Sequence, residues 1–507
     1  MRDVPWQTPS TFAFARMMAW TSRSREEPSR RDVDGPSERA VALSSPARAQ
    51  ISEAATRRNE NGFFLIVALA WGVLFLGPYG RGPLEMDGMV YSALAKHMSE
   101  SGNWRVPHYT HSAYDSYYQH PPLFLWLQAS AFRLFGVSDR SARMLPAMFA
   151  LSTLTALFLW AGPWYGLLAG LFLLSSRVFV RFASDPFLDG PLAFWLVLGS
   201  FCFRRLERES LSVPALVGLA VGAAAAFLTK GLVALALPVS CGVYVCFSGQ
   251  RRRLCARAML ASGAALVPIV AWIAFAGGAR YLRFYWEQSV SGRLTASSAT
   301  DHFSPLVELV RSHWPWLPIY LWGLLRAWRG PMRLAIIASC VILAGFALTG
   351  HMYNYYLVPF FPFAALVAAG AFPLPAAATR RYAAAALGVL VLAGAVSSFW
   401  LPFRVRPQSN DPIRLAAPEA ARRCDAGRVR EVLISDGVAE RWLGLATVLW
   451  STPWEATSVH LPIEASGNDQ VLLSSPSEMP GSGWRYLSLD HAAPFRISTP
   501  IEASLCR

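Results

Sequence analysis

The sequence has few charged residues for its length. They make up 15% of the 507 residues, whereas a soluble domain carries about a quarter. Hydrophobic residues reach 54% and occur in long runs such as Phe63–Leu76 and Ala258–Ala276. Apolar runs of roughly 17–25 residues are typical of membrane spans. The composition therefore excludes a soluble globular protein and predicts an all-α polytopic membrane protein.

Lysine is almost absent. Only two of the 46 basic residues are lysines, Lys96 and Lys230, and each is informative because lysine and arginine are not equivalent at a site. The net charge of +14 comes from arginines in short clusters between apolar runs. Such clusters are typical of cytoplasmic loops in membrane proteins. They do not indicate a nucleic-acid partner.

Cysteines are few and have no metal-binding pattern. None of the seven has CxxC or zinc-finger spacing. Five lie in or beside apolar runs, where a small core residue is the ordinary interpretation. Cys424 and Cys506 lie in the polar C-terminal part and can pair if that part is periplasmic.

The chain divides into three parts. Residues 1–60 are rich in Arg, Ser, Pro and Glu and predict a disordered cytoplasmic tail, with no signal peptide before the first span. Residues 61–401 hold the apolar runs and predict a transmembrane domain. Residues 402–507 contain strand-like pieces, such as Val429–Ile434 and Val471–Ser474, and predict a small α/β domain.

About eleven spans are expected. They are Gly62–Gly77, Met144–Trp160, Trp164–Val180, Pro191–Phe203, Val213–Leu228, Val233–Phe247, Ala258–Ala276, Trp314–Leu325, Leu334–Leu348, Tyr355–Phe372 and Ala383–Leu401. A further apolar run, Pro121–Phe135, is short and aromatic, so it is either a span or a helix lying along the interface.

The arginines decide between these two placements. If Pro121–Phe135 lies flat, twelve arginines of the later loops fall inside, and four arginines and Lys230 fall outside. The inside set is Arg204, Arg205, Arg208, Arg251, Arg252, Arg253, Arg257, Arg326, Arg329, Arg333, Arg380 and Arg381. Counting the run as a span reverses the ratio and violates the positive-inside rule. We therefore predict a flat helix, an inner-membrane location and a periplasmic C-terminal domain.

With this topology, the notable polar residues all fall on the outer side of the membrane. They are Asp87, Gln119, His120, Asp185, Asp189, Lys230, His302, His351 and Asn354. Such a set suits transfer of a group from a lipid-linked donor. A cation such as Lys230 holds the donor phosphate near the membrane surface, and Asp87 or Asp189 is placed to accept the proton of an attacking hydroxyl.

Ordered motifs then point to a known family. The pieces, in chain order, are Asp87-Gly88-Met89-Val90-Tyr91, Glu100-Ser101-Gly102-Asn103-Trp104, Tyr118-Gln119-His120-Pro121-Pro122-Leu123, Ser141-Ala142-Arg143-Met144-Leu145-Pro146, Asp189-Gly190-Pro191-Leu192, Phe227-Leu228-Thr229-Lys230-Gly231 and Tyr355-Tyr356-Leu357-Val358-Pro359. Over roughly residues 62–372 the chain resembles the GT-C membrane glycosyltransferases, specifically the aminoarabinose (lipid A) transferase and dolichyl-phosphate-mannose–protein mannosyltransferase group.

The resemblance implies a fold and a set of roles. It implies a GT-C fold, a polyprenyl-phosphate-linked sugar donor, and a lipid or protein hydroxyl as acceptor, with Pro121–Phe135 as a juxtamembrane helix. It places Asp87 as the catalytic base or a carboxylate that positions the acceptor, Asp189 as a second catalytic aspartate and Lys230 beside the donor phosphate. The expected substrate contacts are Tyr91, Gln119, His120, His302, His351 and Tyr355.

Two departures from the family pattern bear on metal use. Gln119 and His120 stand where relatives often have an acidic residue and a lysine, and Gly88 stands where many have a second acid after Asp87. Glutamine is a poor metal ligand, although His120 and His302 remain a possible pair. We therefore expect no required cofactor and no metal site.

Ordinary structural roles stand beside these hypotheses. Asp87 is also explained as a helix cap, Asp185 before Pro186 as a turn residue, and Lys230 as a side chain that snorkels to the interface. A secondary transporter is disfavoured because no internal repeat is visible. A non-catalytic membrane scaffold stays open, as do the identities of the sugar and the acceptor.

Overall fold

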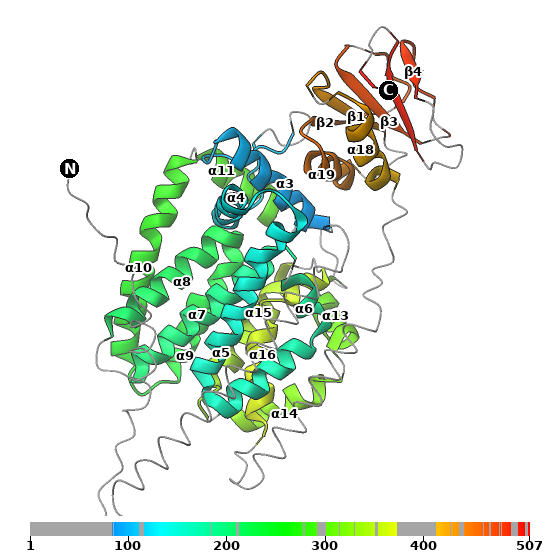
Figure 1. The fold of residues 1–507 in the computed structure, drawn as a ribbon. Helices are drawn as coiled ribbons and strands as arrows, with labels where there is room; N and C mark the ends of the chain where they lie inside the picture. The colour runs from blue at the N-terminus through cyan, green and yellow to red at the C-terminus, as the bar shows by residue number, and fades with distance from the viewer. Residues whose placement is uncertain are drawn as a thin grey trace, which may run out of the picture. The chain divides into compact units, whose positions relative to one another are not determined.

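The structure is a computed structural model that describes residues 84–110, 116–372 and 412–506, with short gaps inside these ranges (Figure 1). The predicted tail 1–60, the predicted spans Gly62–Gly77 and Ala383–Leu401, and His351 lie outside the described residues.

Among the described residues up to 372, most lie in helices. They are α3 (Met86–Ser101), α4 (Leu123–Phe135), α5 (Asp139–Ser175), α6 (Arg177–Ala183), α7 (Asp189–Arg208), α8 (Val213–Lys230), η1 (Gly231–Leu235), α9 (Ala236–Cys246), α10 (Arg251–Phe275), α11 (Ala279–Tyr285), η2 (Trp286–Ser291), η3 (Asp301–Phe303), α13 (Ser304–His313), α14 (Leu317–Ala327), α15 (Arg333–Thr349), η4 (Asn354–Leu357) and α16 (Phe361–Gly370).

Several of these helices are long and apolar enough to cross a membrane. Among the described residues they are the 24 residues Asp139–Gly162, the 34 residues Val213–Cys246 and the 25 residues Arg251–Phe275. A fourth candidate is the pair Trp164–Ser175 and Arg177–Ala183, bent by 81°. The protein is therefore a multi-pass membrane protein, as predicted.

The segment Val213–Cys246 reverses direction at Gly231. Lys230, at its middle, contacts Asp189 at the start of α7, whereas Tyr244, near its end, contacts Arg204 near the end of α7. Gly231 has a φ of +66°, a conformation that glycine adopts without strain. A Cβ there would also lie 2.2 Å from the Tyr285 hydroxyl oxygen. Helices α8 and α9 therefore overlap the predicted spans Val213–Leu228 and Val233–Phe247, and the number of spans stays a prediction.

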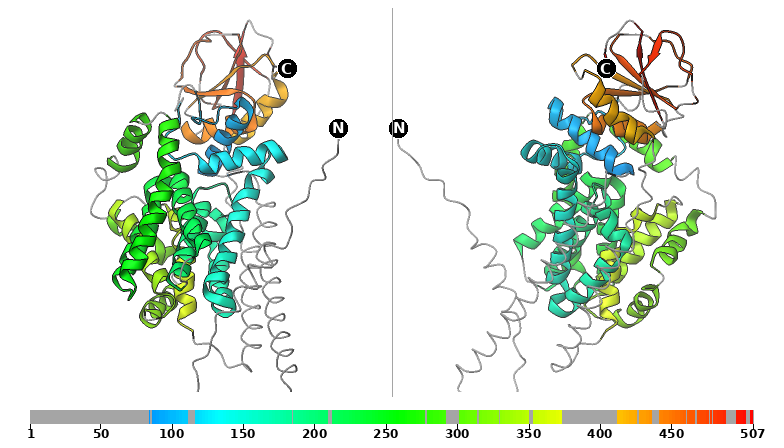
Figure 2. Two further views of the ribbon diagram at one scale, coloured as in Figure 1. Left: turned by 90° about the vertical axis from the view of Figure 1, so that its left-hand side faces the viewer. Right: turned by 45° about the vertical axis from the view of Figure 1, so that its right-hand side comes forward.

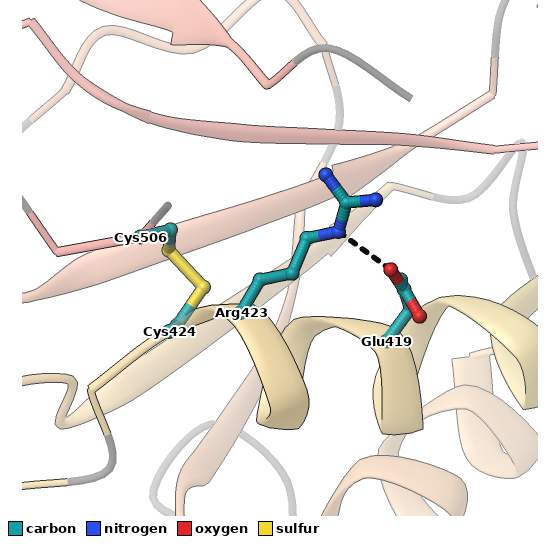
Figure 3. Close-up of a disulfide and its surroundings, with 4 residues drawn as sticks. All are labelled: Glu419, Arg423, Cys424 and Cys506. Carbon is teal, nitrogen blue, oxygen red and sulfur yellow. Dashed lines mark hydrogen bonds and ion pairs between the residues drawn. A yellow bond between two sulfur atoms is a disulfide. The ribbon is translucent and has the colours of Figure 1, made fainter. Parts of the chain in front are cut away.

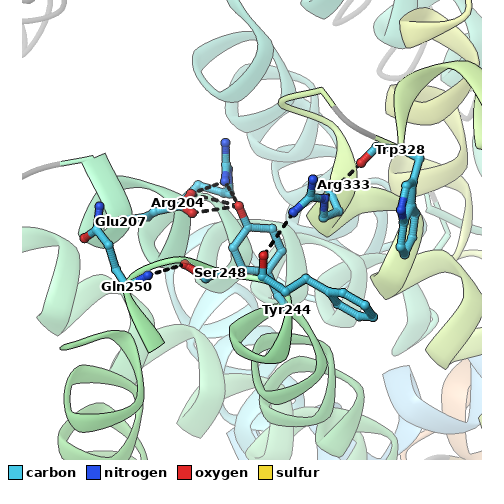
Figure 4. A network of polar contacts seen from close by, with 8 residues as sticks. Arg204, Glu207, Tyr244, Ser248, Gln250, Trp328 and Arg333 are labelled. Atoms are coloured by element: carbon cyan, nitrogen blue, oxygen red, sulfur yellow. Dashed lines mark hydrogen bonds and ion pairs between the residues drawn. The ribbon is translucent and has the colours of Figure 1, made fainter. Parts of the chain in front are cut away.

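The opposite end of α7 carries a polar network, which we call the arginine end (Arg204, Glu207, Tyr244, Arg257 and Arg333). Figure 4 shows most of it. The Arg204 guanidinium bonds both Glu207 and the Tyr244 hydroxyl, and Tyr244 also bonds Glu207 at 2.8 Å. Arg257 donates to the Leu206 carbonyl at 2.6 Å. Arg333 donates to the carbonyls of Trp328 at 2.9 Å and Phe247 at 3.3 Å. These contacts join the ends of α7, α9 and α14 to the starts of α10 and α15.

Two predicted boundaries can be compared with the helices. The predicted break between Trp160 and Trp164 coincides with Gly162, whose φ of +78° interrupts α5. The predicted flat helix Pro121–Phe135 is α4, which has 13 residues. At 1.5 Å per residue it is about 20 Å long, shorter than the ~30 Å hydrocarbon core. Its position relative to the membrane stays a prediction.

Residues 412–506 form a mixed sheet with two helices. The elements are α18 (Pro412–Arg423), β1 (Glu431–Ser435), α19 (Arg441–Ser451), β2 (Glu455–Val459), β3 (Gln470–Ser474), β4 (Trp484–Tyr486) and β5 (Arg496–Pro500). The strand order is β2-β1-β3-β5-β4, parallel across β2, β1 and β3 and antiparallel at β5 and β4. Figure 2 shows both helices on one side of the sheet.

Alternation along the strands explains this arrangement, because successive side chains point to opposite faces of a sheet. Val432 and Ile434 of β1 pack in one core with α18 and α19, whereas Leu433 packs on the other face with Leu472 and Trp484. Cys424 and Cys506 form a disulfide, which confirms the pairing that the sequence left open (Figure 3).

The sheet, α18 and α19 share this core with α3 and α4. Met89 and Leu94 of α3 and Phe124 of α4 are buried in the same cluster as Leu445 and Leu449 of α19. Helix α3, which carries Asp87 in its first turn, therefore packs partly on residues more than 300 positions later in the chain. A separate domain over residues 402–507 stays a prediction.

Candidate active site

Asp87 lies in the first turn of α3, as a helix N-terminus favours for a carboxylate. Its Oδ2 accepts a hydrogen bond of 2.7 Å from the hydroxyl of Tyr355 in η4. The Tyr355 ring is held by Phe182 and Phe187, at centroid distances of 5.4 and 5.1 Å. One carboxylate oxygen of Asp87 is thus fixed by a rigid phenol.

Asp189 and Lys230 form a buried ion pair. The Lys230 Nζ lies 2.5 Å from Asp189 Oδ1, and the two side chains are 8% and 2% exposed. Asp189 begins α7 and Lys230 ends α8, so each charge also meets the favourable end of its own helix dipole. The antiparallel packing of α7 and α8 brings together two residues that the sequence singled out separately.

Aromatic rings connect the pair to Asp87. The Lys230 Nζ lies 4.4 Å from the ring centroid of Tyr356 and 5.8 Å from that of Tyr355, within the range of cation–π attraction. We call Asp87, Asp189, Lys230, Tyr355 and Tyr356 the site cluster. Two carboxylates, one ammonium and two phenols from four elements converge there.

Tyr91 and His120 border the site cluster. Tyr91 lies one turn after Asp87, is buried, and has its ring centroid 5.8 Å from that of His120. Burial and the charge of Asp87 raise the pKa of Tyr91 well above its usual value. The same two causes raise the pKa of Tyr109. These phenols therefore stay protonated at neutral pH.

Close packing explains why a glycine follows Asp87. A Cβ at Gly88 would lie 3.2 Å from Pro186 and 3.3 Å from Phe187, tighter than an ordinary van der Waals contact. A larger side chain at this position would have to push this turn away. The turn carries Asp189 two residues later, so Gly88 lets α3 approach the second aspartate closely.

Asp185 has a larger role than the turn residue that the sequence suggested. Its Oδ1 accepts a 2.7 Å bond from Nε of Arg143, and both side chains are at most 5% exposed. Arg143 lies in α5, within one of the matched motifs. The pair fixes the turn before Asp189. The sequence supplied a signal in the motif around Arg143, but nothing in it indicated the partner.

The remaining predicted residues have fewer contacts that tie them to the site cluster. Gln119 is half-buried, and His302 bonds the Ala347 carbonyl through Nδ1 at 2.7 Å, at the last turn of α15. Within the described ranges no three His, Cys, Asp or Glu side chains gather in a way that could hold a metal ion.

A polar cavity that the sequence did not indicate lies at the other end of α3. It has a volume of about 520 Å³ and is lined partly by His97, Glu100, His108 and Glu455. The rings of His97 and His108 stack at 5.7 Å, and His108 Nε2 lies 3.4 Å from Glu455 Oε1. These residues come from α3, the following loop and β2, and no local pattern connects them.

Comparisons with known proteins agree with the motifs. Residues 119–275 match the family described as dolichyl-phosphate-mannose-protein mannosyltransferase. The undecaprenyl phosphate-alpha-4-amino-4-deoxy-L-arabinose arabinosyl transferase of Pectobacterium atrosepticum is 28% identical over 330 residues, and that of Aeromonas salmonicida 30% over 331. Each match covers 60% of this chain and 58% of the relative, so the chain spans little more than half of these relatives' length.

Solved structures share the fold. ArnT from Cupriavidus metallidurans bound to undecaprenyl phosphate has a TM-score of 0.68 at 19% identity, covering 88% of this chain and 99% of that one. The archaeal oligosaccharyltransferase AglB from Archaeoglobus fulgidus has a TM-score of 0.54 at 12% identity, covering 79% and 65%.

The fold is that of the GT-C membrane glycosyltransferases. Within this class the chain is similar to the aminoarabinose transferases and protein mannosyltransferases, which confirms the resemblance that the motifs indicated.

Proposed function

We propose that the protein is a glycosyltransferase of the bacterial inner membrane. It moves a sugar from a polyprenyl-phosphate donor to a hydroxyl of a lipid A-like or protein acceptor on the periplasmic face. The observation that carries the proposal is the site cluster, in which Asp87, hydrogen-bonded by Tyr355, stands beside the buried pair Asp189–Lys230. A base and a cation are the two groups that such a transfer needs.

The reaction is a direct displacement at the anomeric carbon. The acceptor oxygen forms the new bond to that carbon as the bond to the phosphate oxygen breaks, and the leaving polyprenyl phosphate keeps the electron pair. Asp87 takes the proton of the acceptor hydroxyl. The Tyr355 bond leaves the second oxygen of Asp87 for this role. One displacement with one base inverts the anomeric configuration.

Lys230 is the proposed partner of the donor phosphate, and Asp189 is its anchor. A phosphate ester is a good leaving group that needs neutralising charge rather than an acid. The carboxylate of Asp189 orients the ammonium through their 2.5 Å contact. Tyr91, Gln119, His120, His302, His351 and Tyr355 remain the proposed substrate contacts, without a required metal.

The proposed orientation places the site cluster outside and the arginine end inside. Arg204, Arg257 and Arg333 gather at the end of α7 opposite Asp189, and positive charge favours the cytoplasmic side. The disulfide Cys424–Cys506 supports the periplasm for the C-terminal part, since disulfides persist in oxidising compartments. The proposed architecture keeps about eleven spans, a tail over residues 1–60, a transmembrane domain over 61–401 and an α/β domain over 402–507.

A donor assay tests the proposal. Purified protein in liposomes receives polyprenyl-phosphate sugars with a labelled sugar, and release of polyprenyl phosphate is followed together with label in lipid or peptide acceptors. We expect release that requires an acceptor. Movement of label across the bilayer without cleavage would instead indicate a transporter. If neither cleavage nor movement of label occurs, the result would indicate a non-catalytic scaffold.

The acceptor is identified in cells. Mass spectrometry of surface lipids and glycoproteins from a deletion strain, compared with its parent, is expected to show loss of one sugar from one class. If the sugar is lost from lipid A-like molecules, the acceptor is a lipid. If it is lost from proteins, the acceptor is a protein.

A further inference from the structure

Lys96, the second of the two lysines, has an unusual environment. It lies on α3, and its side chain is buried. Its Nζ donates to the carbonyl oxygens of Leu449 at 2.9 Å, Trp450 at 3.4 Å and Thr452 at 2.6 Å. An ammonium has three donors, and here they meet three carbonyls of another segment. Burial of such a group is costly unless it is satisfied in this way.

The three carbonyls lie at the end of α19. The helix ends at Ser451, and the last carbonyls of a helix have no partner within it and carry its negative dipole end. Lysine side chains near helix ends commonly bond such carbonyls. Lys96 therefore caps α19 from α3, across a sequence separation of 353 residues from Leu449.

Other contacts place α19 against the helices that surround the site. The Thr447 hydroxyl donates to Met89 Sδ at 3.3 Å, two residues after Asp87. Trp450 Nε1 donates to Asp139 Oδ1 at 2.8 Å at the start of α5, and its ring lies 5.7 Å from Phe132 of α4. Helix α19 thus contacts α3, α4 and α5 together.

Helix α3 connects Lys96 to Asp87. The two residues are nine positions apart, or about 13 Å along the axis. At the start of α3, Tyr355 holds Asp87 and Gly88 meets Pro186. Toward its other end, the ammonium of Lys96 fixes the helix to the C-terminal segment. Because a helix transmits displacement along its length, loosening Lys96 tilts or shifts Asp87.

We propose that Lys96 is a positioning residue for the transfer reaction, because it caps α19 and thereby holds the helix that places Asp87. This inference rests on the proposed function of Asp87. It also assigns the C-terminal segment a part in catalysis, since α19 supplies the fixed point against which α3 is held.

The test compares variants of the full-length protein in liposomes. Lys96→Met keeps the length and apolar stem and removes the three donors. We expect kcat to fall roughly ten- to hundred-fold, because misplacement of a reacting group by about 1 Å costs up to ~10²-fold, with donor KM within about twofold. Lys96→Arg keeps the charge and the donors, so it is expected to recover most of kcat. If Lys96→Met does not accumulate, Lys96→Gln replaces it.

The matched control is Arg423→Gln. It removes the ion pair of Arg423 with Glu419 on α18, in the same C-terminal segment, but leaves the contacts of α19 with α3. We expect kcat to remain near that of the wild type. An equal fall in Arg423→Gln would overturn the proposal, because it would indicate general loosening of the C-terminal segment. An unchanged kcat in Lys96→Met would overturn it as well.

Hydrogen exchange separates this inference from the function on which it rests. We expect faster amide exchange in peptides of α3 and the last turn of α19 in Lys96→Met, and wild-type exchange in Lys96→Arg. Unchanged exchange in α3 would overturn the positioning role whatever the kinetics show. If the wild type transfers no sugar from any donor, the proposed function fails, whereas the exchange experiment still decides whether Lys96 holds α3.

Discussion

At the scale of single residues, the site cluster combines groups that are fixed before any substrate arrives. Asp87 has one oxygen occupied by Tyr355, and Lys230 is held by Asp189 at 2.5 Å. Such preorganised groups cost little reorganisation at the moment of reaction. Three variants test these assignments.

Asp87→Asn keeps the shape of the side chain and one acceptor oxygen for Tyr355 but removes the basicity. Loss of a general base typically costs 10²–10⁴-fold, so we expect kcat to fall by about that much with near-normal folding and donor affinity. Steady-state kinetics with labelled donor measures it. Turnover above about a tenth of wild type would remove Asp87 from the role of base and make Asp189 the next candidate.

Lys230→Ala is expected to raise the donor KM strongly and to lower kcat less, because the ammonium binds the phosphate before and during bond breaking. It also leaves the buried carboxylate of Asp189 without its opposite charge, and breaking a buried pair costs about 3–5 kcal/mol of stability. The double variant Lys230→Met/Asp189→Asn removes both charges. We expect the double variant to be more stable than Lys230→Ala but to have an equally high donor KM. A normal donor KM in both would reduce Lys230 to a structural residue.

Chelation tests the departure at Gln119. Glutamine is a poor metal ligand, and His302 is engaged by the Ala347 carbonyl. We expect sugar transfer to survive EDTA with at most a modest fall. Complete loss that zinc or manganese restores would show that His120, His302 or other residues bind a metal.

At the scale of elements, the attachment of α3 to the C-terminal segment should depend on pH. Burial lowers the pKa of His97, which stacks on His108 beside Glu455. A pKa lowered on folding favours the neutral ring, so this contribution is complete above the unfolded pKa of about 6.5 and declines as the pH falls below it.

We therefore expect the thermal midpoint of the purified protein to decrease when the pH is lowered from 7.5 to 5.5. His97→Gln, which cannot titrate, should show a smaller fall over the same interval. Differential scanning fluorimetry in detergent measures both. Identical pH dependence in the two proteins would show that His97 does not contribute.

Local sequence patterns predicted much of the helical part and little of the long-range pairing. Apolar runs predicted several helix boundaries, including the break that the structure places at Gly162, and Lys230 was expected at a helix end. The partners of Lys96 could not be predicted because they are backbone carbonyls, which every residue has and which residue type does not distinguish. Arg143 lies in a visible motif and Asp185 was noted as a turn residue before Pro186, but only the folded chain reveals that they pair.

At the scale of the whole molecule, the proposed orientation is open to a direct test. Reporter fusions after Arg105 and after Gln408 are expected to show periplasmic activity, because the arginine end should face the cytoplasm. Fusions to alkaline phosphatase and to green fluorescent protein give complementary readings. Cytoplasmic activity at either position would overturn the topology.

The cap on α19 has a consequence for the timing of biosynthesis. Lys96 leaves the ribosome 353 residues before Leu449, and translation at ~5–20 residues per second makes this interval about 18–70 s. During this interval, the nascent chain contains α3 and Lys96 but not α19, the helix that Lys96 caps. If Lys96 acts as proposed, a chain that terminates before α19 lacks the contact that holds α3, and we expect it to transfer sugar more slowly than the full-length protein.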